Sequence, residues 1–235
     1  MQFDVILVGA GIGGLTAALA LQQQGLRVAL CEQANEPFVG GAGLVIGASG
    51  ARVLGQLGLG AALDDLAVRP AHIAIRHFQT GRLLAETPTS AGDGCRIGRA
   101  DLQRALIAAI HSNDRDCLRT GHTLADIGQD GSGLSALFGD RQMLRGSLLV
   151  ACDGQRSAVR TRLFGDEQPR FTGYQVWQGL VPMSHLTAAA PTLGDATVWI
   201  GPGQQLGCGS ICRGTQLAWR ALARSNRWTD EAWTK

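Results

Sequence analysis

The chain has 235 residues, which is enough for one sizeable hydrophobic core, or for one domain and part of another. Its formal net charge of +2 and its scattered arginines do not make the basic surface that nucleic-acid binding requires. Lys235 is the single lysine, and this excludes P-loop nucleotide binding and pyridoxal or Schiff-base chemistry, both of which need a lysine inside the site.

The first thirty residues predict a βαβ unit. Glycines follow the first apolar strand at the spacing G-x-G-x-x-G and lead directly into a helix. This arrangement leaves backbone N–H groups and the positive end of the helix dipole free for a pyrophosphate. We expect strands at 3–8 and 27–31, a helix at 12–24, and pyrophosphate contacts from Gly9, Gly11, Gly13 and Gly14.

Glu32 comes directly after the second strand of this unit. A carboxylate at that position can accept hydrogen bonds from the ribose hydroxyls of an adenosine cofactor. The alternative is an ordinary exposed acid.

The middle of the chain changes from helical to strand-like patterns. Residues 37–50 are too rich in glycine for a regular element, so we expect a loop that approaches a ligand, or else a surface loop. Helices are predicted at 51–58 and 61–67. A strand at 72–78 then turns through 79–82 into a second, antiparallel strand.

The residue pattern in the second half of the chain predicts a helix, a hairpin and two groups of strands. Helical spacing covers 99–110, and short strands follow near 122–127 and 134–138, before a buried strand at 147–152. Strand-like segments at 171–181 and 196–200 belong to a further sheet. The fold class is therefore α/β: a dinucleotide-binding βαβ unit interrupted by an antiparallel β-ribbon, with a partial antiparallel sheet after it.

Asp153 ends the buried strand and is followed by Gly154. Its carboxylate is expected at the carboxyl edge of the sheet, where open α/β folds bind their ligands. A structural role is also open, because Asp153 could cap the helix that begins near Gln155. The two roles are compatible.

Five segments, taken in order, resemble the class A flavoprotein aromatic hydroxylases, particularly those that act on salicylate and hydroxynicotinate. The resemblance covers residues 3 to about 203. The segments are the opening glycine run, Gly41-Ala42-Gly43-Leu44, Arg99-Ala100-Asp101-Leu102, the Asp-Gly segment at 148–160, and Tyr174-Gln175-Val176-Trp177-Gln178-Gly179-Leu180-Val181-Pro182.

The resemblance implies a Rossmann-like FAD-binding domain and hydroxylation of a small aromatic acid with FAD, dioxygen, and NADH or NADPH. It implies FAD contacts from the glycines, Glu32, Gly43, Arg99 and Asp153. A guanidinium such as that of Arg99 suits a phosphate because its planar fork holds two oxygens at once, although Arg99 could also be a surface arginine. No catalytic side chain is assigned, since the cofactor supplies the bond-making chemistry.

The domain boundaries follow from the same resemblance. Residues 1–71 and 97–168 are expected to form the FAD-binding domain, and 72–96 with 169–235 a partial substrate domain. No Gly-Asp-Ala-Ala-His-like stretch follows the second sheet, so the chain is expected to be C-terminally incomplete relative to the family. Apolar edges at 198–200 and 217–219 should then be exposed unless a homodimer or a partner chain covers them. Residues 208–214 depart from the strand expected there.

Two other functions remain open: a non-catalytic flavin- or nucleotide-binding fragment, and an NAD-dependent dehydrogenase. The six cysteines contain no C-x-x-C pair, which favours buried free thiols in a reducing compartment and gives no metal site. The apolar run at 5–21 follows an acid, and no Lys or Arg precedes it, so we expect no signal sequence and no membrane anchor. A cytoplasmic location is the expectation.

Overall fold

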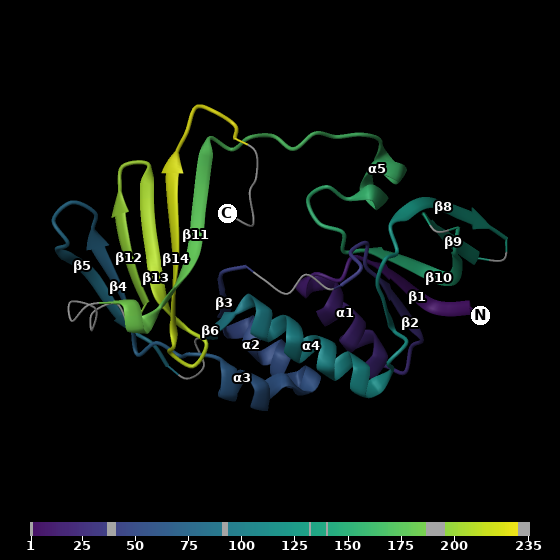
Figure 1. Ribbon diagram of the computed structural model, residues 1–235, viewed down its shortest axis with the longest axis horizontal. Helices are drawn as coiled ribbons and strands as arrows, with labels where there is room; N and C mark the ends of the chain where they lie inside the picture. Colours follow the sequence, from purple (N-terminus) through teal and green to yellow (C-terminus); the bar gives the residue numbers. More distant parts are fainter. Residues whose placement is uncertain are drawn as a thin grey trace. The chain divides into compact units, whose positions relative to one another are not determined.

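The computed structural model describes residues 2–36, 41–90, 94–131, 133–139, 141–186 and 196–229. The chain divides into two compact units, which are described one at a time. The first unit comprises residues 1–39, 57–59 and 103–169, and the second comprises 40–56, 60–102 and 170–235. Figure 1 gives the helices and strands of both.

A mixed sheet of six strands forms the first unit, in the order β7-β2-β1-β10-β9-β8. The first four of these strands are mutually parallel, and β9 and β8 continue the sheet as an antiparallel hairpin. The strands are β1 (Gln2–Val8), β2 (Val28–Cys31), β7 (Leu118–Arg119), β8 (Leu124–Asp130), β9 (Gly133–Phe138) and β10 (Met143–Ala151).

Helix α1 (Ile12–Gln23) joins β1 to β2 and packs on both strands. Its buried residues Leu15, Ala18 and Leu19 have the i, i+3, i+4 spacing of one helix face, which explains why this segment is helical. Ile6 and Phe138 belong to a separate buried cluster that joins β1 to the hairpin. The unit also contains the short helix α5 (Ala158–Phe164) and most of α4 (Arg99–Asn113).

The second unit has a six-stranded sheet, in the order β11-β14-β13-β12-β4-β5. All neighbours in it are antiparallel except β12 and β4, which are parallel. A two-stranded antiparallel ribbon of β3 and β6 completes the strands. The strands are β3 (Gly43–Gly47), β4 (His72–His77), β5 (Leu83–Pro88), β6 (Gly94–Gly98), β11 (Tyr174–Pro182), β12 (Ala196–Gly201), β13 (Gln204–Ile211) and β14 (Gln216–Arg224).

Helix α2 (Ala48–Leu54) continues through the kinked turn η1 (Gly55–Leu59) into α3 (Gly60–Leu66). Gly58 has a φ of 85° at the kink, a conformation that glycine adopts without strain. Helices were expected at 51–58 and 61–67, so the structure confirms helical chain here but moves its bounds. A single-turn helix, η2 (Met183–His185), follows β11.

The predicted fold class is confirmed, with the βαβ unit, the β4–β5 ribbon and the later sheet all present. The expectation that 37–50 holds no regular element was wrong, because β3 occupies Gly43–Gly47 and pairs with β6. Residues 37–40 lie outside the described part. The strand expected at 147–152 begins already at Met143, since its first residues pair with β9, and α5 starts at Ala158 rather than near Gln155.

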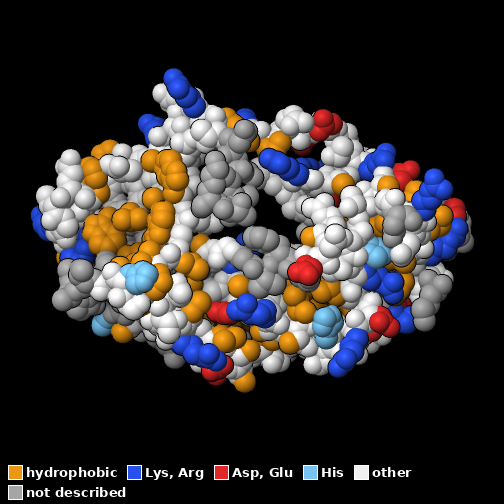
Figure 2. All heavy atoms as spheres, viewed as in Figure 1, with side chains coloured by type: hydrophobic (Ala, Val, Ile, Leu, Met, Phe, Trp, Pro, Cys, Tyr) orange, Lys and Arg blue, Asp and Glu red, His pale blue; other side chains and the backbone are white. Residues whose placement is uncertain are grey.

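The expected exposure of 217–219 was also wrong. Leu217 and Ala218 are buried, and Gly43 of the β3–β6 ribbon lies against Ala218. Ile200, in contrast, has 41% of its surface exposed. The segment 208–214 was expected to depart from a strand, yet its first half lies in β13. Hydrophobic side chains are visible on the surface over this sheet (Figure 2).

Among the described residues, no helix is both long enough and apolar enough to cross a lipid bilayer.

Candidate functional site

The glycine run and the Asp-Gly segment meet at the carboxyl edge of the first sheet. Gly9 N–H donates to the Cys31 carbonyl at 2.7 Å, and Cys152 N–H donates to the Val8 carbonyl at 2.7 Å. Gly9 has a φ of 100°, and a Cβ on it would lie 2.5 Å from the Cys152 carbonyl oxygen. Gly9 must therefore be glycine, both for its backbone conformation and for this close approach.

The other glycines of the run divide into two kinds. A Cβ on Gly14 would lie only 1.9 Å from the Gly9 carbonyl oxygen, so Gly14 lets the helix pack closely on the turn. Gly11 and Gly13, in contrast, have no atom within 4 Å of a Cβ placed on them. Gly11 is the N-cap of α1, and no side chain there caps the helix. The first turn of α1 thus combines uncapped N–H groups with open space, as an anion site requires.

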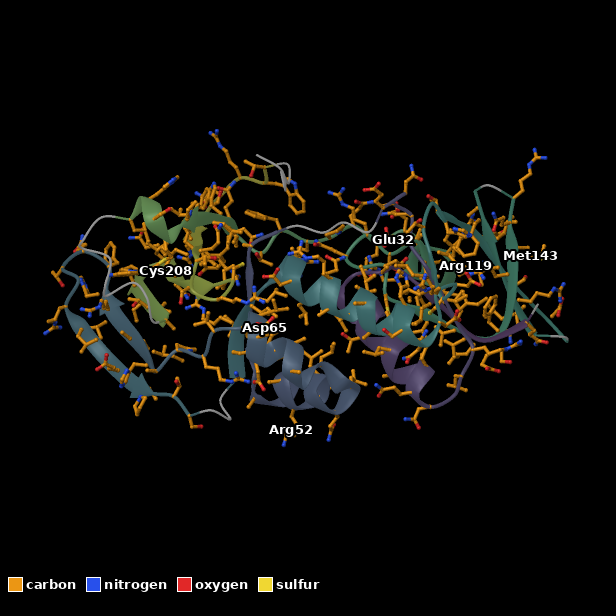
Figure 3. The ribbon with its side chains drawn as sticks, turned by 60° about the horizontal axis from the view of Figure 1, so that its bottom comes forward. Glu32, Arg52, Asp65, Arg119, Met143 and Cys208 are labelled. Atoms are coloured by element: carbon orange, nitrogen blue, oxygen red, sulfur yellow. The ribbon has the colours of Figure 1, made fainter. Side chains whose placement is uncertain are left out.

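Glu32 lies against the same turn. Its Oε2 accepts a hydrogen bond from Ala10 N–H at 2.8 Å, and its Oε1 accepts one from Ala34 N–H at 3.0 Å. Glu32 N–H donates to the Arg119 carbonyl at 2.8 Å, which places the end of β2 beside β7 (Figure 3). The structure therefore brings the predicted ribose acid together with the predicted pyrophosphate glycines.

Asp153 is engaged at the start of α5. Its Oδ1 accepts the Ser157 hydroxyl at 2.6 Å, and its Oδ2 accepts Val159 N–H at 3.1 Å. Ser157 is the N-cap, and its Oγ accepts Arg160 N–H at 2.9 Å. The capping role of Asp153, weighed from the sequence, is thus present in the structure.

We expect Asp153→Ala to lower the free energy of unfolding by about 1–2 kcal/mol, because it removes two hydrogen bonds at the start of α5. Urea denaturation followed by circular dichroism measures the change. Asp166→Ala, at an exposed acid beyond the same helix, is the control and should change stability by less than about 0.5 kcal/mol. Equal effects of the two substitutions would contradict the capping role.

In the second unit, Arg99 and Gly41 lie together. Gly41 has a φ of 99°, and a Cβ on it would lie 3.0 Å from Arg99 Cδ. Arg99 Nε is buried and has no hydrogen-bond partner in the described part of the chain, so this guanidinium retains a donor for a ligand. Gly43 has a packing reason to be glycine, because its Cβ would meet Ala218 Cβ at 2.9 Å. The geometry around Gly43 therefore favours packing over a ligand contact.

Sequence reasoning missed two polar side chains. Gln103 lies one helical turn after Arg99 in α4; it is only 4% exposed, and none of the residues that the structure describes forms a hydrogen bond with its Oε1. Arg96 Nε, on β6, is likewise buried without a partner. No sequence signal could have found either, because a buried polar atom becomes conspicuous only once its surroundings are known.

The cysteines are structural. None of the six forms a disulfide, and burial raises the pKa of Cys31 to about 12 and that of Cys117 to about 11. Burial, followed by the charge of Asp153, also raises the pKa of Cys152. Thiols protonated at neutral pH are poor nucleophiles and poor metal ligands. The described residues include no cluster of three or more His, Cys, Asp or Glu that could hold a metal ion.

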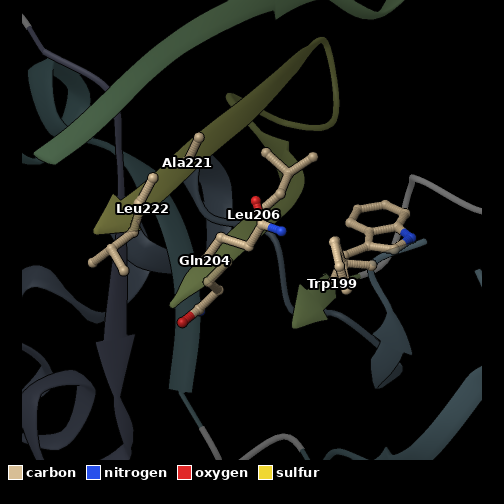
Figure 4. Close-up of a pocket in the computed structure, with 8 residues that line it drawn as sticks. Trp199, Gln204, Leu206, Ala221 and Leu222 are labelled. Carbon is tan, nitrogen blue, oxygen red and sulfur yellow. The ribbon is translucent and has the colours of Figure 1, made fainter. Parts of the chain in front are cut away.

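A cavity of about 410 Å³ opens on the second sheet (Figure 4). Its walls include Trp199, Leu206 and Ala221, which face one another across β12, β13 and β14 in the strand register. Directly paired residues of antiparallel strands share one face, so this cavity belongs to a single face of the sheet. Phe78 closes it with a further aromatic wall.

The profile of the family described as "FAD binding domain" matches residues 2–226. The chain belongs to this family of FAD-binding domains. It is 31% identical to the 3-amino-4-hydroxybenzoate 2-monooxygenase PtmB3 of Streptomyces platensis over 98% of this chain, and 32% identical to the FAD-dependent urate hydroxylase of Klebsiella pneumoniae over 86%. It spans 59% and 53% of those two relatives' lengths.

Solved structures agree with the family assignment. Klebsiella pneumoniae HpxO, complexed with FAD and uric acid, superposes with a TM-score of 0.84 at 26% identity. The superposition covers 97% of this chain and 58% of that one. CtdE in complex with FAD shares the fold, with a TM-score of 0.84 at 22% identity.

The residues of this chain fit an FAD. The open space before Gly11 and Gly13 gives the pyrophosphate room against the uncapped start of α1. Glu32 supplies acceptor oxygens at the same turn, as ribose hydroxyls need. Taken by itself, Arg99 of the second unit has an Nε without a hydrogen-bond partner among the described residues, and such a group suits an anionic oxygen.

Proposed function

We propose that this chain is the cofactor-binding and substrate-sheet part of an FAD-dependent monooxygenase that hydroxylates a small aromatic acid with NADH or NADPH and dioxygen. The observation that carries the proposal is the 2.8 Å hydrogen bond from Ala10 N–H to Glu32, which joins an open glycine turn to the acid that we propose binds the ribose. The named relatives act on aminohydroxybenzoate and urate, which supports an aromatic substrate.

Bound FAD supplies the electron transfer and the oxygen activation on which hydroxylation depends. The chain's own residues bind and orient it. Gly11, Gly13 and the start of α1 hold the pyrophosphate, Gly9 and Gly14 make the turn possible, and Glu32 accepts the ribose hydroxyls. Arg99 neutralises phosphate charge. Asp153 holds the start of α5 beside the glycine turn. Gln103 offers its buried amide oxygen to a cofactor hydroxyl.

We propose that residues 1–71 and 97–168 hold the cofactor, and that 72–96 with 169–235 form the substrate sheet. We propose that Gly43 contacts the cofactor through its backbone only, because a side chain at this position would collide with Ala218. A second copy or a partner chain is proposed to cover edge strand β11, on which Trp177 is 50% exposed. A cytoplasmic location is proposed because none of the six cysteines forms a disulfide.

Purified chain incubated with FAD tests the proposal in two steps. A flavin absorbance spectrum that stays with the protein through gel filtration is expected first. NADH or NADPH oxidation with formation of a hydroxylated product from simple aromatic acids is expected second. Retained flavin without any product would favour the alternative, a non-catalytic flavin-binding fragment. This alternative is specific to the present chain because it spans only 59% of the length of its relative PtmB3. The dehydrogenase alternative loses its support to the family match.

Glu32→Gln is expected to weaken FAD binding about 10-fold, because it keeps the side-chain length but removes the charge and one of the two acceptor oxygens. Quenching of flavin fluorescence on titration measures the affinity. Glu36→Gln, at an exposed acid four residues further along, is the matched control and should bind FAD as the parent does. Unchanged affinity in Glu32→Gln would remove the ribose role.

A further inference from the structure

Arg96 is a half-buried cation for which the described residues provide no ion pair. Its Nη1 donates to the Cys208 carbonyl at 3.0 Å, and its Nε is buried without a partner. Burial lowers the pKa of the Arg96 guanidinium, and no carboxylate contributes to offset that effect. A desolvated charge without a counter-ion is costly, so this position favours an anionic ligand.

The Arg96 guanidinium lies against Cys208 and Gly209 of β13 in the second unit (Figure 3 labels Cys208 on this strand). A Cβ on Gly209 would fall 1.5 Å from Arg96 Nη1 and 2.2 Å from its Cζ. The guanidinium thus occupies the space that a Gly209 side chain would fill. Gly43 of the ribbon packs on Ala218, which pairs with Gly209, so Arg96 and the ribbon lie on the same face of the sheet.

Space remains beside this guanidinium. Gly207 points to the same face as Gly209, because side chains two residues apart in a strand share a face. A Cβ on Gly207 would meet only Val198 Cγ2, at 3.9 Å. The trough over Gly207 therefore has no side chain of its own and can accept a planar group.

The surroundings of the trough suit an aromatic acid. Ile200 points to this face and is 41% exposed, which offers apolar surface to a ring. Arg220 pairs directly with Gly207 and points to the same face, so a second cation borders the trough. The cavity lined by Trp199 and Leu206 lies on the opposite face, since those residues alternate with Val198 and Gly207. The two features are separate.

We propose that Arg96 binds the carboxylate of the aromatic substrate over the Gly207–Gly209 trough and so selects acids over neutral aromatics. This inference rests on the proposed function and names the residue that reads the substrate's charge. An arginine is suited to the task, because its guanidinium stays charged and can donate two parallel hydrogen bonds to a carboxylate.

The test compares benzoate with benzamide, which has nearly the same shape but no charge, as ligands of the FAD-loaded chain in isothermal titration calorimetry. The parent is expected to bind benzoate at least about 10-fold more tightly than benzamide, a difference typical of one charged hydrogen-bonding contact. Arg96→Gln should reduce that ratio to about one, and Arg96→Lys, which keeps the charge, should retain most of it. A thermal melt of each variant identifies any that fails to fold. If Arg96→Gln does not fold, the benzoate-to-benzamide affinity ratio of Arg96→Lys decides the test.

Arg76→Gln is the matched control. Arg76 also donates from Nη1 to a backbone carbonyl, that of Gly81 at 3.1 Å, but it pairs with Trp199 and so lies on the opposite face. This variant should keep the parent's ratio. A benzoate-to-benzamide affinity ratio near one in the parent overturns the inference, and so does a ratio in Arg96→Gln that equals the parent's. Either result leaves the proposed function standing. Failure of both ligands to bind a chain that retains FAD overturns the inference together with the aromatic substrate class.

Discussion

Gly11→Val is expected to weaken FAD binding at least about 100-fold, equivalent to about 2.7 kcal/mol, while it lowers the stability of the cofactor-free protein by at most about 1 kcal/mol. The backbone of Gly11 has a φ of −68° and a ψ of 178°, which any residue can adopt. No atom of the described residues lies within 4 Å of its Cβ position, so the small loss of stability arises only because valine is a poorer N-cap than glycine. The same valine would fill the space that the pyrophosphate must enter.

Flavin fluorescence titration and thermal denaturation without FAD measure the two quantities separately. Gly131→Val is the matched control, because Gly131 also has no atom within 4 Å of its Cβ position but lies in the turn between β8 and β9. It should retain FAD affinity. Normal flavin binding by Gly11→Val would show that the open space at α1 is not the cofactor site.

Gly14→Ala is expected to lower the free energy of unfolding by more than about 4 kcal/mol, with or without cofactor. Its Cβ would lie 1.9 Å from the Gly9 carbonyl oxygen and 3.2 Å from Cys152 Cβ. Both near neighbours are held by the sheet, so the helix would have to move away from the turn. Urea denaturation measures the loss.

Gly13→Ala provides the contrast on the same helix. Gly13 is exposed and has nothing within 4 Å of its Cβ position, so alanine should stabilise the protein by up to about 1 kcal/mol through helix propensity. A melting curve for Gly14→Ala that matches the parent's would mean that α1 does not pack on β1 as closely as described.

Together the two substitutions separate glycines that the ligand requires from glycines that the fold requires. The G-x-G-x-x-G spacing alone predicts the same pyrophosphate role for all four glycines of the run. In the structure, a Cβ on Gly14 would lie 1.9 Å from another atom, whereas a Cβ on Gly13 would face open space. Only a substitution at an open position therefore reports on cofactor binding without disturbing the fold.

The sequence alone determined the βαβ unit, because strand and helix periodicity, the glycine turn and Gly25 after the helix are all local signals. It also determined that Glu32 would end the second strand. These features depend on neighbours within a few residues, so composition and spacing are sufficient to predict them. The β4–β5 hairpin was predictable for the same reason.

Tertiary structure decided what depends on partners distant in the chain. The ribbon strand β3 forms in a glycine-rich segment only because β6, some fifty residues later, pairs with it. Ala218 is buried where Gly43 of the ribbon lies against it, and an isolated segment carries no sign of what covers its face. Arg96 becomes a candidate anion site only when β13 brings Gly209 beneath its guanidinium. Pairing and burial are properties of the assembled chain, and this is the physical reason why sequence pattern could not supply them.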